Sequence, residues 1–394
     1  MSRLWDKGAP LDSRVLQYTA GDDHALDNRL VAYDVRASIA HAQMLNAQGL
    51  LSSDDCKLIC DGLTAIGAEH AQGQWQVTLQ HEDGQTALET LLTQRVGQAG
   101  ARVHLGRSRN DQVLTALRLY LRDATEHLNQ ATLTVASALD ALGEREANTA
   151  LPGYTHMQQA MPSSVKLWAG GFAAELRDDA AALLQVQRRV GKSPLGSAAG
   201  YGTPNLPLDR TATAKALGFN EVHEPVTAVQ LSRGKAEAQL LFEIVMVMQD
   251  VARLSSDLCL FYTQEFAFVS LPDAFTTGSS IMPQKRNPDV FELIRGRSAA
   301  AQAALFEVLG IVAKLPSGYQ RDLQLIKVPL FRAIDLCSET LDILAPALAE
   351  VKFRKENISM DASINAAAEA YELVKTEGIP FREAYLRVGK KYLK

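Results

Sequence analysis

Apolar side chains recur at helical spacing over unusually long stretches of this sequence. Between residues 111 and 147, Leu, Val and Ala recur three, four or seven positions apart, and no proline interrupts them. This spacing predicts one amphipathic helix, about 55 Å long at 1.5 Å per residue. Further helices are predicted over 163–190, 234–268 and 288–314. The pattern therefore predicts a mainly α protein built around a bundle of long helices.

The helix predicted over 234–268 has almost no polar face. Residues 240–248 read LLFEIVMVM, which is apolar nearly all the way round a helix. A helix of this kind must be buried on most sides. We therefore expect a bundle that is shared between the subunits of a homo-oligomer.

Strand patterns are short and weak, and the strongest covers residues 75–78. The chain is expected to divide into an N-terminal helical domain (1–105), a central long-helix domain (106–351) and a small C-terminal helical domain (352–394). No internal repeat is visible in the sequence.

Composition and charge narrow the classes of function. Of the 394 residues, 47% are hydrophobic and 22% are charged, as in an ordinary globular protein. The net charge of −5 argues against a nucleic-acid partner. No apolar run approaches the ~18 residues of a membrane span, and the first residues carry charges where a signal peptide is apolar. We expect a cytoplasmic protein with no membrane partner.

The cysteine pattern does not predict a metal site. Cys56 and Cys60 lie one helical turn apart, but no second pair and no nearby histidine accompany them. We expect reduced, structural cysteines. The glycine-rich stretch 191–203 lacks the spacing of a phosphate-binding loop and is interpreted as turns.

Four polar segments interrupt the helical pattern. The first, HLGRSRND at 104–111, directly precedes the longest helix. It could be an anion-binding cradle, because Arg binds carboxylates bidentately and a helix start adds positive potential. A helix cap with solvated arginines is the alternative.

The other three segments also leave alternatives open. PGYTHMQQ at 152–159 contains His156, and a single histidine is more often an ordinary hydrogen-bonded residue. GSSIMPQKRNP at 278–288 could be a flexible loop or a hinged loop that closes over a substrate and carries Lys285. YQRDLQLIK at 319–327 clusters donors that could grip a polar ligand.

Together these segments resemble the fumarase/aspartase superfamily, and its argininosuccinate lyase branch most closely. The loop at 278–288 is similar to the loop that defines the superfamily. The segments at 104–112, 152–158 and 319–327, with DVRASIAH at 34–41, are similar to the argininosuccinate branch. The resemblance covers nearly the whole chain.

The resemblance implies an enzyme of arginine biosynthesis, a carbon–nitrogen lyase that splits argininosuccinate into arginine and fumarate by acid–base catalysis. It implies no metal and no organic cofactor. It also implies three domains with a long central helical bundle shared across a homotetramer, whose active sites combine segments from different subunits.

The resemblance also assigns roles to individual residues. Ser279 and His156 form the acid–base pair, with Ser279 expected as the base, and Glu292 orients the imidazole. Either Lys285 or a helix N-terminus makes the alkoxide of the serine accessible, and Lys285 also holds substrate carboxylates. Substrate binding falls to Ser108, Arg109, Asn110, Thr155, Asn287, Tyr319, Gln324 and Lys327.

Several positions depart from the family pattern. Leu105 stands where the family usually has Thr, and segments 18–21, 224–233 and 325–326 also differ. The C-terminus is short for the family. These departures keep open an N-acylated form of the substrate. An adenylosuccinate lyase and a non-catalytic helical oligomer are two further alternatives.

Overall fold

The computed structural model describes residues 12–392 and confirms the mainly α fold. The chain forms two compact units, each assembled from three separated stretches of sequence. Unit 1 consists of Met1–Leu128, Ala182–Ile244 and Gln302–Asp335, and unit 2 consists of Asn129–Ala181, Val245–Ala301 and Leu336–Lys394. The division into three domains remains a prediction.

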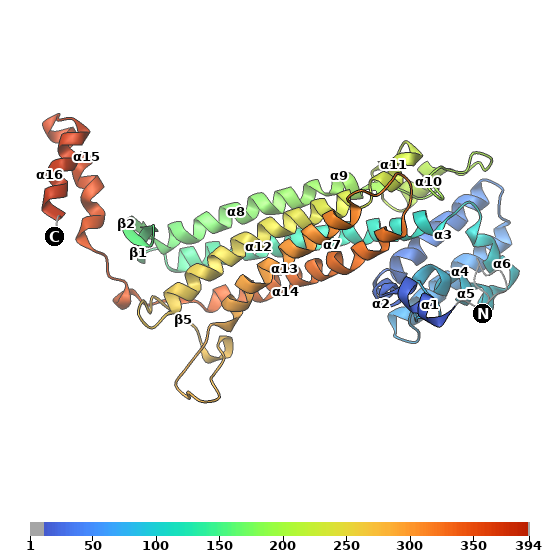
Figure 1. Cartoon of the computed structure of the whole chain (residues 1–394), viewed down its shortest axis with the longest axis horizontal. Helices are drawn as coiled ribbons and strands as arrows, with labels where there is room; N and C mark the ends of the chain where they lie inside the picture. Colours follow the sequence, from blue (N-terminus) through green and yellow to red (C-terminus); the bar gives the residue numbers. More distant parts are fainter. Residues whose placement is uncertain (1–11, 393–394) are drawn as a thin grey trace. The chain divides into compact units, whose positions relative to one another are not determined.

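Long helices dominate the cartoon of the chain (Figure 1). The α-helices, long and short, are in chain order α1 (Ser13–Ala20), α2 (Asp23–Leu26), α3 (Val31–Ala47), α4 (Ser53–Ala71), α5 (Gly84–Val96), α6 (Gln98–Ala101), α7 (Arg109–Arg145), α8 (Val165–Gln185), α9 (Gln187–Val190), α10 (Arg210–Ala216), α11 (Val226–Leu231), α12 (Lys235–Tyr262), α13 (Asp289–Val312), α14 (Lys327–Glu350), α15 (Ala366–Glu377) and α16 (Phe381–Tyr392).

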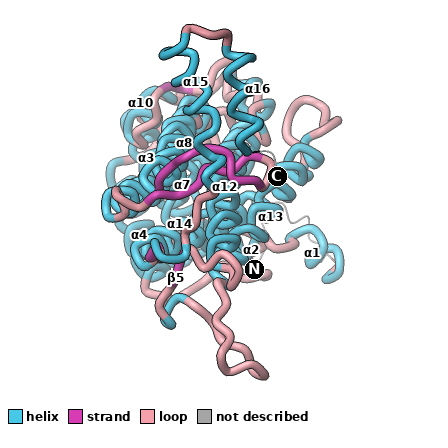
Figure 2. Tube along the Cα trace, turned by 90° about the vertical axis from the view of Figure 1, so that its left-hand side faces the viewer, coloured by secondary structure: helices cyan, strands magenta, loops and turns pink. Residues whose placement is uncertain are grey.

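The strands are short, as the magenta segments of the Cα trace show (Figure 2). They are β1 (Ala150–Thr155), β2 (Gln158–Ser164), β3 (Lys192–Ser193), β4 (Glu221–Val222), β5 (Val269–Ser270) and β6 (Lys352–Phe353). The β1–β2 and β5–β6 pairs are antiparallel and the β3–β4 pair is parallel.

The predicted helices agree with the structure except near their ends. The 111–147 prediction corresponds to α7, which begins and ends two residues earlier. The helix predicted over 163–190 is broken at Val186 into α8 and α9, and the one predicted to reach 268 ends at Tyr262. Of the apolar run in α12, Leu240, Ile244 and Met248 are fully buried, whereas Phe242 is 48% exposed.

The strongest of the weak strand patterns, at 75–78, does not form a strand. These residues have no regular structure, because side chains bind the backbone groups that a neighbouring strand would bind. The Val77 amide donates to Asn28 Oδ1 at 2.8 Å, the Val77 carbonyl accepts from Asn28 Nδ2 at 3.3 Å, and the Thr78 amide donates to His81 Nδ1 at 3.2 Å.

Each unit contains an apolar core of its own. In unit 1, helices α3, α4 and α5 pack around Leu45, Ile59 and Leu92, all of them fully buried. In unit 2, α15 and α16 pack around Ala370, Ala384 and Val388.

All four cysteines are free thiols, as expected. Each helix within residues 12–392 is too short or too polar to span a bilayer.

Candidate functional site

A polar cavity of about 130 Å³ in unit 1 brings two of the four polar segments together. Arg109 and Asn110, at the start of α7, line it together with Tyr319, Gln324 and Lys327. Ser108 lies directly beside them, and its hydroxyl accepts a hydrogen bond from the Asn110 amide at 3.3 Å. The fold therefore collects every predicted binding residue of unit 1 in one place.

Carboxylates that the sequence analysis did not single out also lie at this cavity, next to Lys327. Lys327 is 1% exposed, and its Nζ lies 2.6 Å from Asp27 Oδ1 and 2.9 Å from Asp23 Oδ1. Burial opposes the charge on Lys327, but the two carboxylates prevail and raise its pKa. Burial also raises the pKa of Asp23 to about 6. Lys327 is thus the centre of an internal ion cluster, and its role in substrate binding remains a prediction.

Two further cations of the cavity are also paired. Arg109 forms an ion pair with Asp83, and Arg321 Nη2 lies 3.0 Å from Glu82 Oε1. Such pairing fixes the direction of each guanidinium but reduces the positive charge available to an incoming carboxylate.

Arg233 is the exception, and the sequence reasoning did not single it out as a site residue. It lines the cavity, is 5% exposed and forms no ion pair with any residue in 12–392. Its guanidinium carbon lies 5.6 Å from the ring centre of Tyr319, and its Nε has no hydrogen-bond partner within the described chain. Its Nη2 donates to the Leu323 carbonyl at 3.5 Å. A buried guanidinium without a carboxylate partner is the group best suited to bind a substrate carboxylate.

Asp111 anchors the segment that carries Arg109 and Asn110. It is fully buried, and its carboxylate accepts hydrogen bonds from the amides of Ser108 (2.9 Å), Gly196 (3.0 Å) and Ala198 (2.8 Å). Burial raises the pKa of Asp111 to about 6, against the effect of these donors. The glycine-rich stretch at 191–203 begins with strand β3 and continues as turns, and its amides at 196 and 198 bind the start of α7 through Asp111.

Helix α3 supports the same segment from its other side. His41 Nε2 donates to the Leu105 carbonyl at 2.8 Å, and Arg107 Nη1 donates to Ser38 Oγ at 2.9 Å. Burial lowers the pKa of His41 to about 3, so this histidine is neutral. The motif at 34–41 thus positions the polar segment and does not itself line the cavity.

The other predicted site residues belong to unit 2. Thr155 ends strand β1, and His156 and Met157 form the two-residue turn that leads into β2. Both turn residues have positive φ, 54° and 61°, which strains residues other than glycine. His156 is exposed at the tip of this hairpin, and the sequence pattern did not predict the hairpin.

Ser279 lies in a loop that is closed at its base. Thr277 and Asn287 exchange two backbone hydrogen bonds, of 3.1 and 2.9 Å, which pin the ends of the segment between them. Ser279 Oγ accepts from the amides of Ile281 (3.3 Å) and Met282 (3.1 Å). These donors would stabilise negative charge on the hydroxyl oxygen.

The remaining unit 2 residues are not joined to one another in this chain. Lys285 and Glu292 are exposed, and neither side chain forms a hydrogen bond or ion pair with any residue in the described range. In the same range no hydrogen bond connects His156 to Glu292. The expected orientation of the imidazole by Glu292 is therefore not made within a single chain.

Comparison with known proteins identifies the family. Residues 13–303 match the lyase family profile. The argininosuccinate lyase of Sorangium cellulosum is 48% identical over 389 residues, which cover 98% of this chain and 90% of that protein. The chain belongs to the argininosuccinate lyase family. Another member, from Thermotoga neapolitana, is 39% identical and is matched over 99% of this chain and 98% of its own length.

Solved structures support the fold of this argininosuccinate lyase family member. EDDS lyase in complex with formate superposes with a TM-score of 0.82 at 24% identity, over 97% of this chain and 76% of that one. Class II fumarase from Schistosoma mansoni superposes with a TM-score of 0.76 at 17% identity, over 97% and 93% of the two chains. Identities this low concern the fold alone.

Proposed function

We propose that the protein cleaves argininosuccinate into arginine and fumarate. The polar cavity carries this proposal, because residues 109–110 and 319–327, more than 200 positions apart, converge there around the unpaired guanidinium of Arg233. Arg233 would hold a substrate carboxylate, and Asn110 and Tyr319 would donate hydrogen bonds to the same polar end. We expect the reaction to take place in the cytoplasm, where cysteines stay reduced.

The chemistry is an elimination that needs a base and an acid. The alkoxide of Ser279 takes the proton from the succinyl carbon next to a carboxylate. The released electron pair forms the double bond of fumarate while the bond to the guanidinium nitrogen breaks, and His156 protonates that nitrogen. The two amides facing Ser279 Oγ support its role as base, because they stabilise the alkoxide.

Lys285 and Asn287 are assigned to the substrate carboxylate on which negative charge develops, and Thr155 to a contact beside His156. Positioning and electrostatic stabilisation would supply most of the rate. Glu292 would orient His156 after the two residues meet across a subunit boundary.

We further propose that the complete site forms in a homotetramer. Large apolar side chains on the long helices remain exposed in a single chain, among them Leu167 (68%), Leu293 (62%) and Phe306 (70%). Helices of partner subunits would cover such side chains. If one site takes Ser279 and His156 from different chains, mixing Ser279→Ala and His156→Asn proteins restores activity that neither has alone.

A related substrate with a modified amino group is a second candidate. Gln324 Nε2 donates to the carbonyls of Thr19 (3.0 Å) and Ala20 (3.2 Å), and the next residue is Gly21. A Cβ on Gly21 would lie 3.9 Å from Gln324 Nε2, so the absence of a side chain there leaves room beside this amide.

One experiment tests both candidates. The purified protein is incubated separately with argininosuccinate, its N-acylated form and adenylosuccinate, and the products are identified by mass spectrometry. Arginine and fumarate from the first substrate support the proposal. Cleavage of the acylated form alone favours the second candidate, and no cleavage of any substrate contradicts both.

A further inference from the structure

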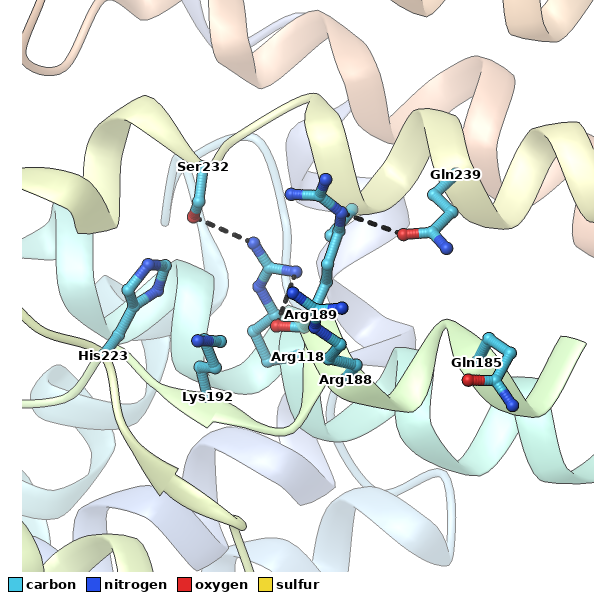
Figure 3. A pocket seen from close by; sticks show the side chains of 9 residues that line it. Arg118, Gln185, Arg188, Arg189, Lys192, His223, Ser232 and Gln239 are labelled. Carbon is cyan, nitrogen blue, oxygen red and sulfur yellow. Dashed lines mark hydrogen bonds between the residues drawn. The ribbon is translucent and has the colours of Figure 1, made fainter. Parts of the chain in front are cut away.

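A second cavity in unit 1, of about 320 Å³, is lined by cations (Figure 3). Arg118 comes from α7, Arg188 and Arg189 come from α9, and Lys192 comes from β3. No carboxylate lines this cavity among the residues that the structure describes. It shares no lining residue with the polar cavity described above.

Arg118 forms the buried wall of this cavity. It is 1% exposed, and its Nη2 donates to Ser232 Oγ at 3.1 Å (Figure 3). Burial lowers the pKa of Arg118, and the buried carboxylate of Glu237 acts against this effect. Neither oxygen of that carboxylate has a hydrogen-bond partner within residues 12–392. Arg118 thus brings a desolvated guanidinium to the cavity, where electrostatic interactions are stronger than in water.

The cations outnumber the carboxylates around them. Lys192 Nζ forms an ion pair with Glu221 Oε1 at 2.7 Å. Arg188 and Arg189 form no ion pair in the described part of the chain, and Arg189 Nε donates to the neutral Gln239 at 2.9 Å. Two carboxylates, Glu237 and Glu221, thus act on the four cations that line the cavity, which leaves an excess of two positive charges.

His223, which also lines the cavity, does not add to this charge at neutral pH. Burial, together with the nearby cations Arg118, Lys192 and Arg210, lowers its pKa to about 4, although Glu221 acts in the opposite direction. The positive charge of the cavity is therefore that of guanidinium and ammonium groups, which persists throughout the physiological pH range.

We propose that this cavity binds a small dianion, either a phosphate group or a dicarboxylate, through Arg118, Arg188 and Arg189. Both ligands present paired oxygens that guanidinium groups bind bidentately. Their two negative charges match the excess of two positive charges. The cavity volume of about 320 Å³ lies at the small end of the range for ligand pockets. The cavity therefore cannot fully enclose a large polyanion. The site is independent of the proposed lyase chemistry.

Isothermal titration calorimetry tests the site with inorganic phosphate and, separately, with succinate, at constant ionic strength set by sodium chloride. We expect saturable binding of at least one of them, with one site per chain. Binding of only one identifies which oxyanion the site takes. Saturable binding of neither contradicts the proposal.

Variants then locate the site. Arg188 and Arg189 are exposed, so replacing both by Gln should leave the fold intact while weakening binding at least tenfold. Circular dichroism checks the fold of each variant. Arg253→Gln removes a positive charge from a side chain that is 79% exposed, and it should leave the affinity unchanged. An equal loss of affinity in Arg253→Gln would mean that the anion responds only to the net charge of the protein, which would contradict a specific site.

A third variant excludes the neighbouring cavity as the binding site. Arg321→Gln alters the polar cavity without touching the cationic one. Unchanged phosphate or succinate affinity supports the proposal. A loss comparable to that of the double variant would place the anion in the polar cavity and overturn the proposal, whatever the outcome of the lyase assays.

Discussion

The polar cavity of unit 1 differs from the hairpin and loop of unit 2 in how firmly its candidate side chains are held. In the cavity, Lys327 and Arg109 are held by carboxylates before any substrate arrives. In unit 2, His156 and Lys285 are exposed and have no side-chain partner in the described chain. The binding groups are therefore held in place within one chain, whereas the proposed proton-transfer groups are not, as expected if a partner subunit completes the site.

Ser279→Ala tests the unit 2 side of this comparison and should have the largest effect. Turnover should fall by roughly 10²–10⁴-fold, the scale for losing a general base. The free energy of unfolding should change by less than about 1 kcal/mol, because the residue lies in a largely exposed loop. Fumarate release measures the first quantity and urea unfolding the second. Ser280→Ala is the matched control, and similar activity of the two variants would contradict the role of Ser279.

His156→Asn should lower turnover on a similar scale of roughly 10²–10⁴-fold, since it removes the proposed acid. Asn is chosen because it tolerates the positive φ of this turn better than most residues. The assay is again fumarate release. Normal turnover in this variant would exclude His156 from proton transfer, whereas lost turnover with a lowered unfolding midpoint would point to a disrupted hairpin.

Lys327→Met tests the unit 1 side through stability. Removing the ammonium leaves Asp23 and Asp27 buried together without their cation, which should cost about 3–5 kcal/mol in the free energy of unfolding. Urea unfolding measures this difference. Lys375→Met, at a side chain that is 74% exposed, should cost almost nothing. A stable Lys327→Met protein with a raised KM would instead make Lys327 a direct substrate ligand.

Arg233→Gln should act on binding more than on the fold. Losing a charge-assisted contact costs about 1.5–3 kcal/mol, so KM should rise at least tenfold if Arg233 holds a carboxylate. Arg233→Lys keeps the charge and should recover part of the affinity. Steady-state kinetics on the wild-type protein and the two variants measures these changes in KM. An unchanged KM in Arg233→Gln would mean that Arg233 does not bind the substrate.

The smallest effect concerns pH. The pKa of His41 is lowered to about 3 by burial, against 6.5 in the unfolded chain, so between these values the unfolded state binds more protons. The stability contributed by neutral His41 is present above pH 6.5 and is lost as the pH falls toward 3. His41→Gln should flatten the fall in unfolding free energy between pH 6.5 and 4.5. An unchanged slope would mean that His41 does not contribute to it.

Several features of the fold could be predicted because they depend on local order. The apolar spacing along α7 predicted its ends to within two residues, and the four polar segments indicated where to look for a site. The turn at His156 and Met157 was not predicted, because neither residue type normally signals a left-handed turn. The apolar residues at 75–78 predicted a strand, but they pack into a helical core instead.

The sequence by itself determined the helices, the family and the identity of the candidate residues. Helical periodicity acts over three or four positions, and the family motifs are contiguous, so both can be read along the chain. Only the tertiary structure decided which charges are free. Lys327 meets Asp27 across 300 positions, and Arg233 is left unpaired beside Tyr319. Charge pairing depends on burial and on contacts between distant segments, and the order of residues along the chain does not contain that information.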